Sequence, residues 1–153
     1  MVRAVSSSSS LVVWGGLLFA TGCAPRVPSE LVPAISPLVG LPVNLCTEEG
    51  LNPLPVQITN VGDDDVTIAS VEFVPDPDQP AGLASFDAPV VDTETLLADG
   101  VAFIQFLYRS PGGVAQQAIL RVISDAVVNP TLDIPATTDD FTPEQRALAD
   151  CEP

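Results

Sequence analysis

Short runs in which apolar and polar residues alternate make up most of this chain, and Gly, Pro, Asn and Asp separate the runs. Residues 54–59 (LPVQIT) alternate and stop at the turn-rich segment 60–63 (NVGD). Residues 66–74 (VTIASVEFV) are rich in β-branched side chains, and their alternation breaks at Ala69 and Ser70. A period of two is typical of a half-buried β-strand. Both runs therefore predict strands, the second with a β-bulge at its break.

Two later runs divide clearly into faces. Residues 101–109 (VAFIQFLYR) place three large side chains on one face: Ile104, Phe106 and Tyr108. Residues 116–124 (QQAILRVIS) place Arg121 opposite an apolar face made by Ala118, Leu120 and Val122. Weaker patterns predict a first edge strand at 41–45, a last strand at 131–134, and short strands near 84–87 and 93–97. About seven short strands without intervening helices predict an all-β chain folded as an antiparallel β-sandwich.

A capping-box pattern follows the last predicted strand. Thr142 stands at the cap position, Pro143 at the first helical position, and Gln145 three residues after the Thr. In this pattern the Thr and Gln side chains satisfy backbone N–H groups that the first helical turn leaves unpaired. The sequence therefore predicts a short helix from Pro143 to about Asp150.

The N-terminal segment has the features of an export signal. Residues 11–20 (LVVWGGLLFA) carry no charge, and this run is too short for a bilayer, which needs roughly 20 apolar residues. Its length fits the core of a signal peptide, whereas a buried helix would show an amphipathic pattern. Ala20-Thr21-Gly22-Cys23 resembles the lipobox of bacterial lipoproteins, which implies cleavage before Cys23 and a lipid on its thiol. Ala20 departs from the usual Leu, so ordinary secretion with a free Cys23 is the alternative.

These features divide the chain into four parts. We expect a signal peptide at 1–22, a lipidated Cys and proline-rich tether at 23–40, the sandwich at 41–138, and a C-terminal helix and tail at 139–153. Pro25, Pro28, Pro33, Pro37 and Pro42 are spaced too closely for a helix and favour an extended tether. The alternative is a proline-rich ligand for a partner domain, although no aromatic or basic flank marks one.

Charge and composition exclude several classes of function. Twenty acidic residues, five Arg and no His give a net charge of −15 over 153 residues, a length that suits one sandwich domain. Such a surface repels nucleic acid and anionic headgroups. Without His or Lys the chain lacks the usual general bases, and it has no nucleophile motif. We therefore expect no catalytic residue, no enzyme activity and no cofactor.

Two acidic clusters are candidates for calcium binding. Asp63-Asp64-Asp65, with Asp76 and Asp78 nearby in sequence, offers hard oxygen ligands, and Glu48-Glu49-Gly50 is a second cluster. Neither has the alternating Asp spacing of a calcium loop. We therefore interpret both as solvated turns and predict no metal site.

Three cysteines remain to be assigned. If Cys23 carries lipid, Cys46 and Cys151 are left, and an exported compartment is oxidising. The sequence therefore predicts a disulfide between Cys46 and Cys151 that holds the C-terminal helix against the sandwich. Two separately buried thiols are the alternative.

Residues 54–135 resemble the immunoglobulin-like domains of the ASH/Hydin (choice-of-anchor D) type. The similar patches are 58–63 followed by 66–68, the Asp99-Gly100 turn before strand 101–109, and 118–125 followed by Asn129-Pro130. The resemblance implies an immunoglobulin-like sandwich of seven strands that serves as a spacer or contacts other proteins. The long, proline-rich middle of the chain departs from the family pattern.

Together these observations favour a lipid-anchored protein of the bacterial cell envelope, in the periplasm or at the outer membrane or cell surface. We expect a non-catalytic structural or protein-interaction module whose partners are the membrane, through its anchor, and another envelope protein. The alternative is a calcium-dependent or glycan-binding adhesin, which a calcium-dependent rise in melting temperature would favour.

Overall fold

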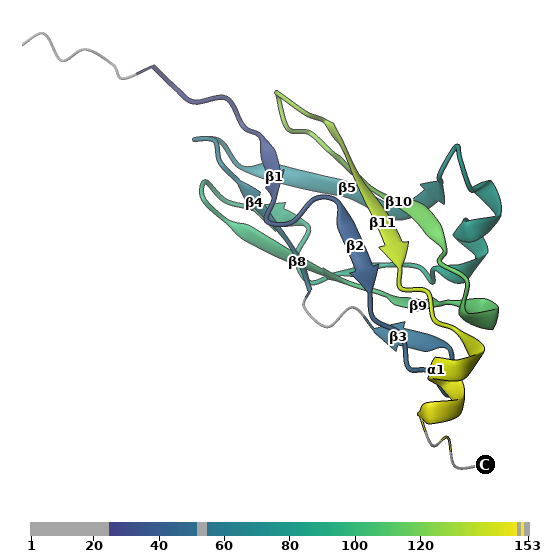
Figure 1. The fold of residues 1–153 in the computed structure, drawn as a ribbon. Coiled ribbons are helices and arrows are strands. Elements are labelled where there is room, and N and C mark those ends of the chain that lie inside the picture. The colour runs from purple at the N-terminus through teal and green to yellow at the C-terminus, as the bar shows by residue number, and fades with distance from the viewer. Residues whose placement is uncertain (1–24, 52–54, 150, 152–153) are drawn as a thin grey trace, which may run out of the picture.

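The computed structural model describes residues 25–51, 55–149 and 151, and the described strands form a β-sandwich (Figure 1). One sheet has the order β1-β4-β8-β6, with these bounds: Leu31–Pro33, Val56–Asn60, Val101–Gln105 and Val90–Val91. The second has the order β2-β11-β10-β5-β7, with these bounds: Leu38–Leu41, Thr131–Thr138, Gln117–Ser124, Val66–Pro75 and Thr95–Leu96. We call them the four-stranded and the five-stranded sheet. β3 (Glu49–Leu51) and β9 (Leu107–Arg109) form a separate ribbon.

The core lies between the two sheets and contains the faces that alternation predicts. Ile104, Phe106 and Tyr108 are buried, and so is the predicted face of β10, which is Ala118, Leu120 and Val122. Phe73 packs on Phe86 at 4.8 Å between ring centroids and edge-on against Phe106 at 4.9 Å. A continuous apolar core therefore joins the sheets, and the predicted sandwich is confirmed.

The predicted β-bulge is also present. β10 pairs with β5 in antiparallel register, with Ile123 opposite Ser70 and Ser124 opposite Ile68. Ala69 is therefore the extra residue, which is the local arrangement of a bulge. The break in alternation at Ala69 and Ser70 located it correctly.

The first strands lie earlier in the chain than predicted. Leu31 in β1 is fully buried and pairs with Asn60 of β4, so the sandwich begins inside the segment expected to be a tether. Pro33 is compatible with β1 because this strand lies at a sheet edge, where a missing N–H is tolerated. The strand expected at 41–45 is instead β2, which ends at Leu41. The chain then turns because the Asn44 carboxamide accepts the N–H of Cys46 at 2.8 Å.

Other segments differ in pairing or in length. β2 lies parallel to β11, so the sandwich is not wholly antiparallel. The strand expected at 84–87 is replaced by a 3₁₀ helix, η1 (Pro80–Ser85), and by one isolated bridge between Phe86 and Tyr108. The run 101–109 divides at Phe106 into β8 and β9, which pair with different strands. β11 continues past Ile134 to Thr138 because the added residues pair with β2.

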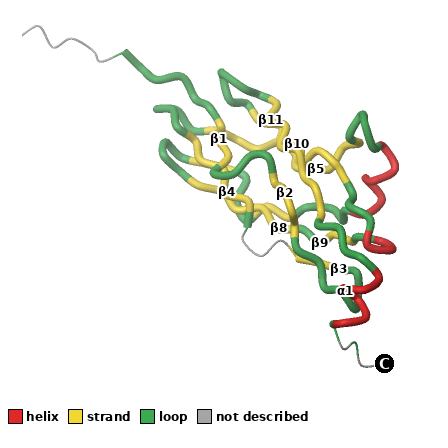
Figure 2. Tube along the Cα trace, in the orientation of Figure 1, coloured by secondary structure: helices red, strands yellow, loops and turns green. Residues whose placement is uncertain are grey.

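Helical structure lies away from residues 25–30, where the described chain begins (Figure 2). Besides η1, it comprises η2 (Pro111–Gly113) and α1 (Pro143–Leu148). The predicted capping box of α1 is present: the Thr142 hydroxyl accepts the Gln145 N–H at 3.2 Å, and the Gln145 side chain accepts the Thr142 N–H at 2.7 Å. Within the described ranges, no helix is long and apolar enough to cross a membrane.

Candidate functional site

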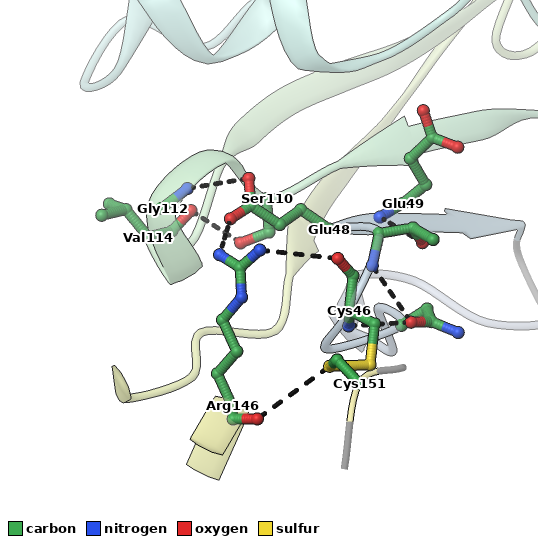
Figure 3. A network of polar contacts seen from close by, with 10 residues as sticks. Cys46, Glu48, Glu49, Ser110, Gly112, Val114, Arg146 and Cys151 are labelled. Atoms are coloured by element: carbon green, nitrogen blue, oxygen red, sulfur yellow. Dashed lines mark hydrogen bonds and ion pairs between the residues drawn. A yellow bond between two sulfur atoms is a disulfide. The ribbon is translucent and has the colours of Figure 1, made fainter. Parts of the chain in front are cut away.

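The predicted pairing of Cys46 with Cys151 is present in the structure (Figure 3). Their Cα atoms lie 5.4 Å apart and 105 residues apart in sequence. Cys46 lies in the turn after β2, and Cys151 follows α1. The side chains of α1 are exposed, so this covalent bond attaches a helix that buries no side chain of its own. Cys23, the predicted site of lipid attachment, lies outside the described residues.

Polar contacts around the disulfide involve one of the two acidic clusters (Figure 3). The Glu48 carboxylate contacts the Arg146 guanidinium and accepts the Gly112 N–H at 3.2 Å. The Glu48 carbonyl accepts the Ser110 N–H at 2.9 Å. Glu48 therefore links β3, η2 and α1, and its carboxylate is engaged by donors of the chain itself.

Ser110 carries a buried hydroxyl at this end of the molecule. Its oxygen lies 2.8 Å from the Val114 carbonyl and 3.0 Å from the Asp139 carbonyl, and its backbone N–H is bonded to Glu48. A nucleophilic Ser requires an adjacent base, and the groups that contact Ser110 are backbone carbonyls. Its position fits a structural role, fastening the segment after β11 to the segment before η2.

The Asp63-Asp64-Asp65 cluster holds the N-terminal segment. The Asp63 carboxylate accepts the Val27 N–H at 2.7 Å, and Asp64 pairs with Arg26 at 3.2 Å. Asp76 lies after the far end of β5, where its carboxylate accepts the Asp78 N–H at 2.8 Å. Among the described residues, no group of three or more His, Cys, Asp or Glu side chains could hold a metal ion. The structure thus separates the acids that the sequence analysis considered together.

The outer face of the four-stranded sheet is the candidate binding surface. β8 alternates so that Ala102 and Ile104 are buried while Phe103 stays 42% exposed on the opposite face. Val90 of β6 is 69% exposed, and Val32 of β1 is exposed as well. Several apolar side chains thus share this outer face, and grouped exposed apolar residues commonly mark binding sites.

Hollows line this face on both sides of Phe103. One of about 240 Å³ lies between Ile35, Gln57 and Phe103, beside the segment that connects β1 to β2. A second of about 330 Å³ lies between Phe103 and Val90, and a third of about 390 Å³ continues past Val90 to Leu107. These hollows can receive apolar side chains of a partner, with Phe103 standing between the first two.

Acidic groups border the same face. The Asp92 carboxylate accepts the Phe103 N–H at 2.8 Å, and the Phe103 carbonyl accepts the Asp92 N–H at 3.1 Å. This pairing fixes a negative charge beside the ring. Asp87 lines the third hollow. The face therefore combines an apolar centre with acidic borders, which suits a partner with apolar side chains and basic neighbours.

Alternation on its own did not identify this surface as a site. It assigned the inward side chains of 101–109 and left Phe103 as an ordinary outward position. The available signal was the aromatic residue itself, because an outward Phe on a half-buried strand departs from the polar outer face that alternation expects. Pairing with β6 and the position of Asp92 could be found only in three dimensions.

The groups with shifted pKa values lie outside this face, and two of them show the structural causes. Burial, helped by the negative charge of Asp139, raises the pKa of Tyr108 to about 12, and its hydroxyl donates to the Pro42 carbonyl at 2.6 Å. On the five-stranded sheet, the hydrogen bonds from Arg121 lower the pKa of Asp133, with both bonds at 2.7 Å. Neither group is poised to exchange protons with a substrate near neutral pH.

Comparison with known proteins identifies the fold. No protein-family model matches the chain, and no curated protein matches it. A solved protein of unknown function from Porphyromonas gingivalis W83 matches with a TM-score of 0.53 and 17% identity, over 74% of this chain and 46% of its own length. The match thus spans less than half of that protein. The ASH/PapD-like domain 7 of human CEP192 matches with a TM-score of 0.50 and 16% identity, over 90% of this chain and 98% of that domain.

These likenesses establish the fold: the chain forms an immunoglobulin-like β-sandwich with a short C-terminal helix. Folds of this kind carry many functions, so the function is argued from the surface.

Proposed function

We propose that this protein is a non-catalytic interaction module of the bacterial cell envelope, anchored by a lipid on Cys23. We further propose that it binds another envelope protein through the outer face of the four-stranded sheet. The observation that carries this proposal is the exposed Phe103 ring between apolar hollows. Aromatic side chains next to pockets are common binding hot spots. The immunoglobulin-like fold is compatible with such a module.

The charge of the surface defines the partner. Asp92 is held beside Phe103, Asp87 lines a neighbouring hollow, and the chain carries a net charge of −15. A complementary partner places apolar side chains in the hollows and Lys or Arg side chains at their borders. Pairs of opposite charge across an interface accelerate association, and salt weakens them when they are exposed to solvent. Binding should therefore weaken as salt concentration rises.

Site-specific crosslinking tests the proposed face. A photoreactive residue at Val90 should crosslink to one envelope protein, whereas the same residue at Val39, which is similarly exposed on β2 of the other sheet, should not. With the purified partner, Phe103→Gln should weaken binding by roughly 30-fold, as expected of a hot spot worth about 2 kcal/mol. Val39→Gln should leave binding unchanged. Equal crosslinking from both positions, or equal affinity of both variants, would reject the face.

The anchor is tested separately. The lipobox-like segment before Cys23 supports cleavage and lipid attachment, and two or more acyl chains give stable anchoring. Intact-mass measurement of the wild-type protein should show a lipid-modified terminus at residue 23. Cys23→Ser should release the protein from the membrane or leave it uncleaved. An unmodified terminus at residue 23 would disprove the anchor while leaving the proposed binding face open to its own test.

A further inference from the structure

The geometry points to direct contact between one end of the sandwich and a neutral lipid surface. This end, which we call the anchor end, consists of residues 26–30, 60–65, 97–100 and 125–130. Figure 1 shows residues 25–30 joining the domain here, at the end opposite α1. The inference rests on the proposed lipid anchor at Cys23 and adds a membrane-binding surface to it.

The N-terminal segment is fastened to the domain from Val27 onward. The Val27 N–H donates to the Asp63 carboxylate at 2.7 Å, and the Asp63 N–H returns a bond to the Val27 carbonyl at 3.1 Å. Leu31 exchanges two hydrogen bonds with the Asn129 carboxamide, at 3.0 and 2.7 Å. Gly62 allows the close approach of this segment, since a Cβ there would lie 2.3 Å from the Cα of Ser29. The segment after Val27 is therefore part of the sandwich rather than a tether.

This fastening leaves a short connection to the membrane. Three residues, 24–26, separate Cys23 from Val27. The four steps from Cys23 to Val27 span at most about 3.6 Å each in an extended chain, or roughly 14 Å. The headgroup layer of each leaflet takes up roughly 5 to 8 Å of that length, from the difference between total and hydrocarbon thickness. The anchor end is consequently held within about 10 Å of the headgroups. The helix α1 lies at the opposite end of the domain.

Exposed aliphatic side chains gather at this end. Val127 is 70% exposed, and its N–H donates to the Ser29 carbonyl at 3.1 Å, which places it beside the N-terminal segment. Leu97 lies next to Asn60, whose side chain donates to the Leu97 carbonyl at 3.1 Å. The exposed apolar residues from the four segments are Val27, Val61, Leu97, Val127 and Val128. Aliphatic side chains held this close to headgroups gain free energy by entering the interface.

The charges of the anchor end select the lipid. The same loops carry exposed carboxylates, and Arg26 is paired with one of them, Asp64. The exposed acidic residues are Asp63, Asp64, Asp65, Asp99 and Asp125, and Glu30 is half-buried. Anionic headgroups repel such a surface, whereas the ammonium groups of zwitterionic phosphatidylcholine do not. We therefore assign a neutral, zwitterionic bilayer as the ligand of the anchor end.

Tryptophan reporters test this contact. The chain has one Trp, Trp14, inside the predicted signal peptide. A mature chain that begins at Cys23 therefore contributes no Trp fluorescence besides that of the introduced reporter. Val127→Trp and Leu97→Trp place a reporter at the anchor end, and Leu148→Trp places the same side chain in α1, where Leu148 is 85% exposed. The lipidated proteins are reconstituted into phosphatidylcholine vesicles with brominated acyl chains, which quench Trp on contact.

Quenching should be severalfold stronger for Val127→Trp and Leu97→Trp than for Leu148→Trp. Replacing part of the phosphatidylcholine with phosphatidylglycerol should reduce it. Equal quenching at the two ends would overturn the inference, as would no quenching at the anchor end of a vesicle-bound protein. Self-association of the Cys23→Ser chain without quenching in vesicles would assign the aliphatic group to a contact between copies instead, and would also overturn it.

The design separates this inference from the proposed lipid anchor. Intact mass first shows whether Cys23 carries lipid. If it does not, the Cys23 thiol is coupled to a maleimide lipid, because Cys46 and Cys151 are joined in a disulfide and do not react. The same quenching comparison then tests the anchor end on a bilayer even where the native anchor has failed.

Discussion

Raising the pH should destabilise this protein through one residue, Tyr108, which is the single Tyr in the sequence. Its side chain is fully buried in the core, and its hydroxyl donates to the Pro42 carbonyl at 2.6 Å. Ionisation would place a negative charge among apolar residues, opposite a carbonyl oxygen that can only accept. Burial, with a smaller effect of Asp139, therefore raises the pKa of Tyr108 from 10.0 to about 12.

The size and sign of the effect follow from that shift. Each factor of ten in proton affinity is worth about 1.4 kcal/mol, so keeping Tyr108 protonated rather than ionised contributes roughly 3 kcal/mol to the free energy of unfolding. The folded protein holds its proton more tightly than the unfolded chain does. The contribution is therefore fully present below pH 10 and is lost as the pH rises from 10 to about 12.

Two measurements test this prediction. The near-ultraviolet absorbance of tyrosinate should titrate near pH 12 in the folded protein and near pH 10 in denaturant. The free energy of unfolding should decrease as the pH rises from 10 to about 12. Tyr108→Phe is the matched control: it should cost about 1 kcal/mol at neutral pH, because the Pro42 carbonyl loses its donor, and should remove most of the alkaline loss. The sequence contains no Lys, which simplifies this pH range.

A tyrosinate that titrates near its ordinary pKa while the protein is still folded would refute this reasoning. The same conclusion would follow if Tyr108→Phe lost stability between pH 10 and 12 as steeply as the wild type. Either result would mean that ionisation of the Tyr108 hydroxyl does not govern stability at alkaline pH.

Three further predictions follow from other contacts. Replacing Cys46 and Cys151 with Ala should lower the free energy of unfolding by about 2–4 kcal/mol in urea titrations, whereas free alkylation of both in the unreduced wild type would contradict the disulfide. Asn60→Ala should cost about 2–3 kcal/mol, because the buried carboxamide donates to three backbone carbonyls. Millimolar calcium should not raise the melting temperature, since Asp63 and Asp64 already have partners; a clear rise would reveal a site.

Local sequence signals predicted those parts of the fold that depend on neighbouring residues. Alternation located the inward face of β10, the break at Ala69 located the bulge, and the spacing of Thr142 and Gln145 located α1. In each case residues a few positions apart decide the structure, through pleat geometry or backbone capping. The disulfide was predicted from cysteine count and compartment rather than from geometry, and it is present in the structure.

Long-range contacts explain what the sequence did not predict. Proline density suggested a tether within 23–40, but bonds to Asp63 and Asn129, distant in sequence, hold residues 27–31 against the sandwich. The outward position of Phe103 was implicit in the pattern, whereas its hollows depend on β6 and on the crossing from β1 to β2. No local signal encodes such neighbours.

The fastening of Val27 also connects the proposed anchor with the proposed binding face. β4 ends and β8 begins at the anchor end, so the face around Phe103 runs along the side of the molecule away from that end. A domain held close to the bilayer by the three residues between Cys23 and Val27 presents such a face sideways, toward a partner in the same membrane. The short connection between Cys23 and Val27 then sets the distance of the domain from the bilayer and the orientation of the binding face. Contact with the partner therefore depends on this connection as well as on the affinity of the face.

Lengthening that connection separates the two effects. A flexible insertion of Gly and Ser between Pro25 and Arg26 leaves the residues of the binding face unchanged, so the affinity for purified partner in solution should equal that of the wild type. In the envelope the same insertion enlarges the volume that the domain explores and lowers its effective concentration near a membrane-bound partner. Crosslinking from Val90 should therefore decline in cells. If it stays at the wild-type level, the short connection does not orient the face, and affinity alone governs the contact.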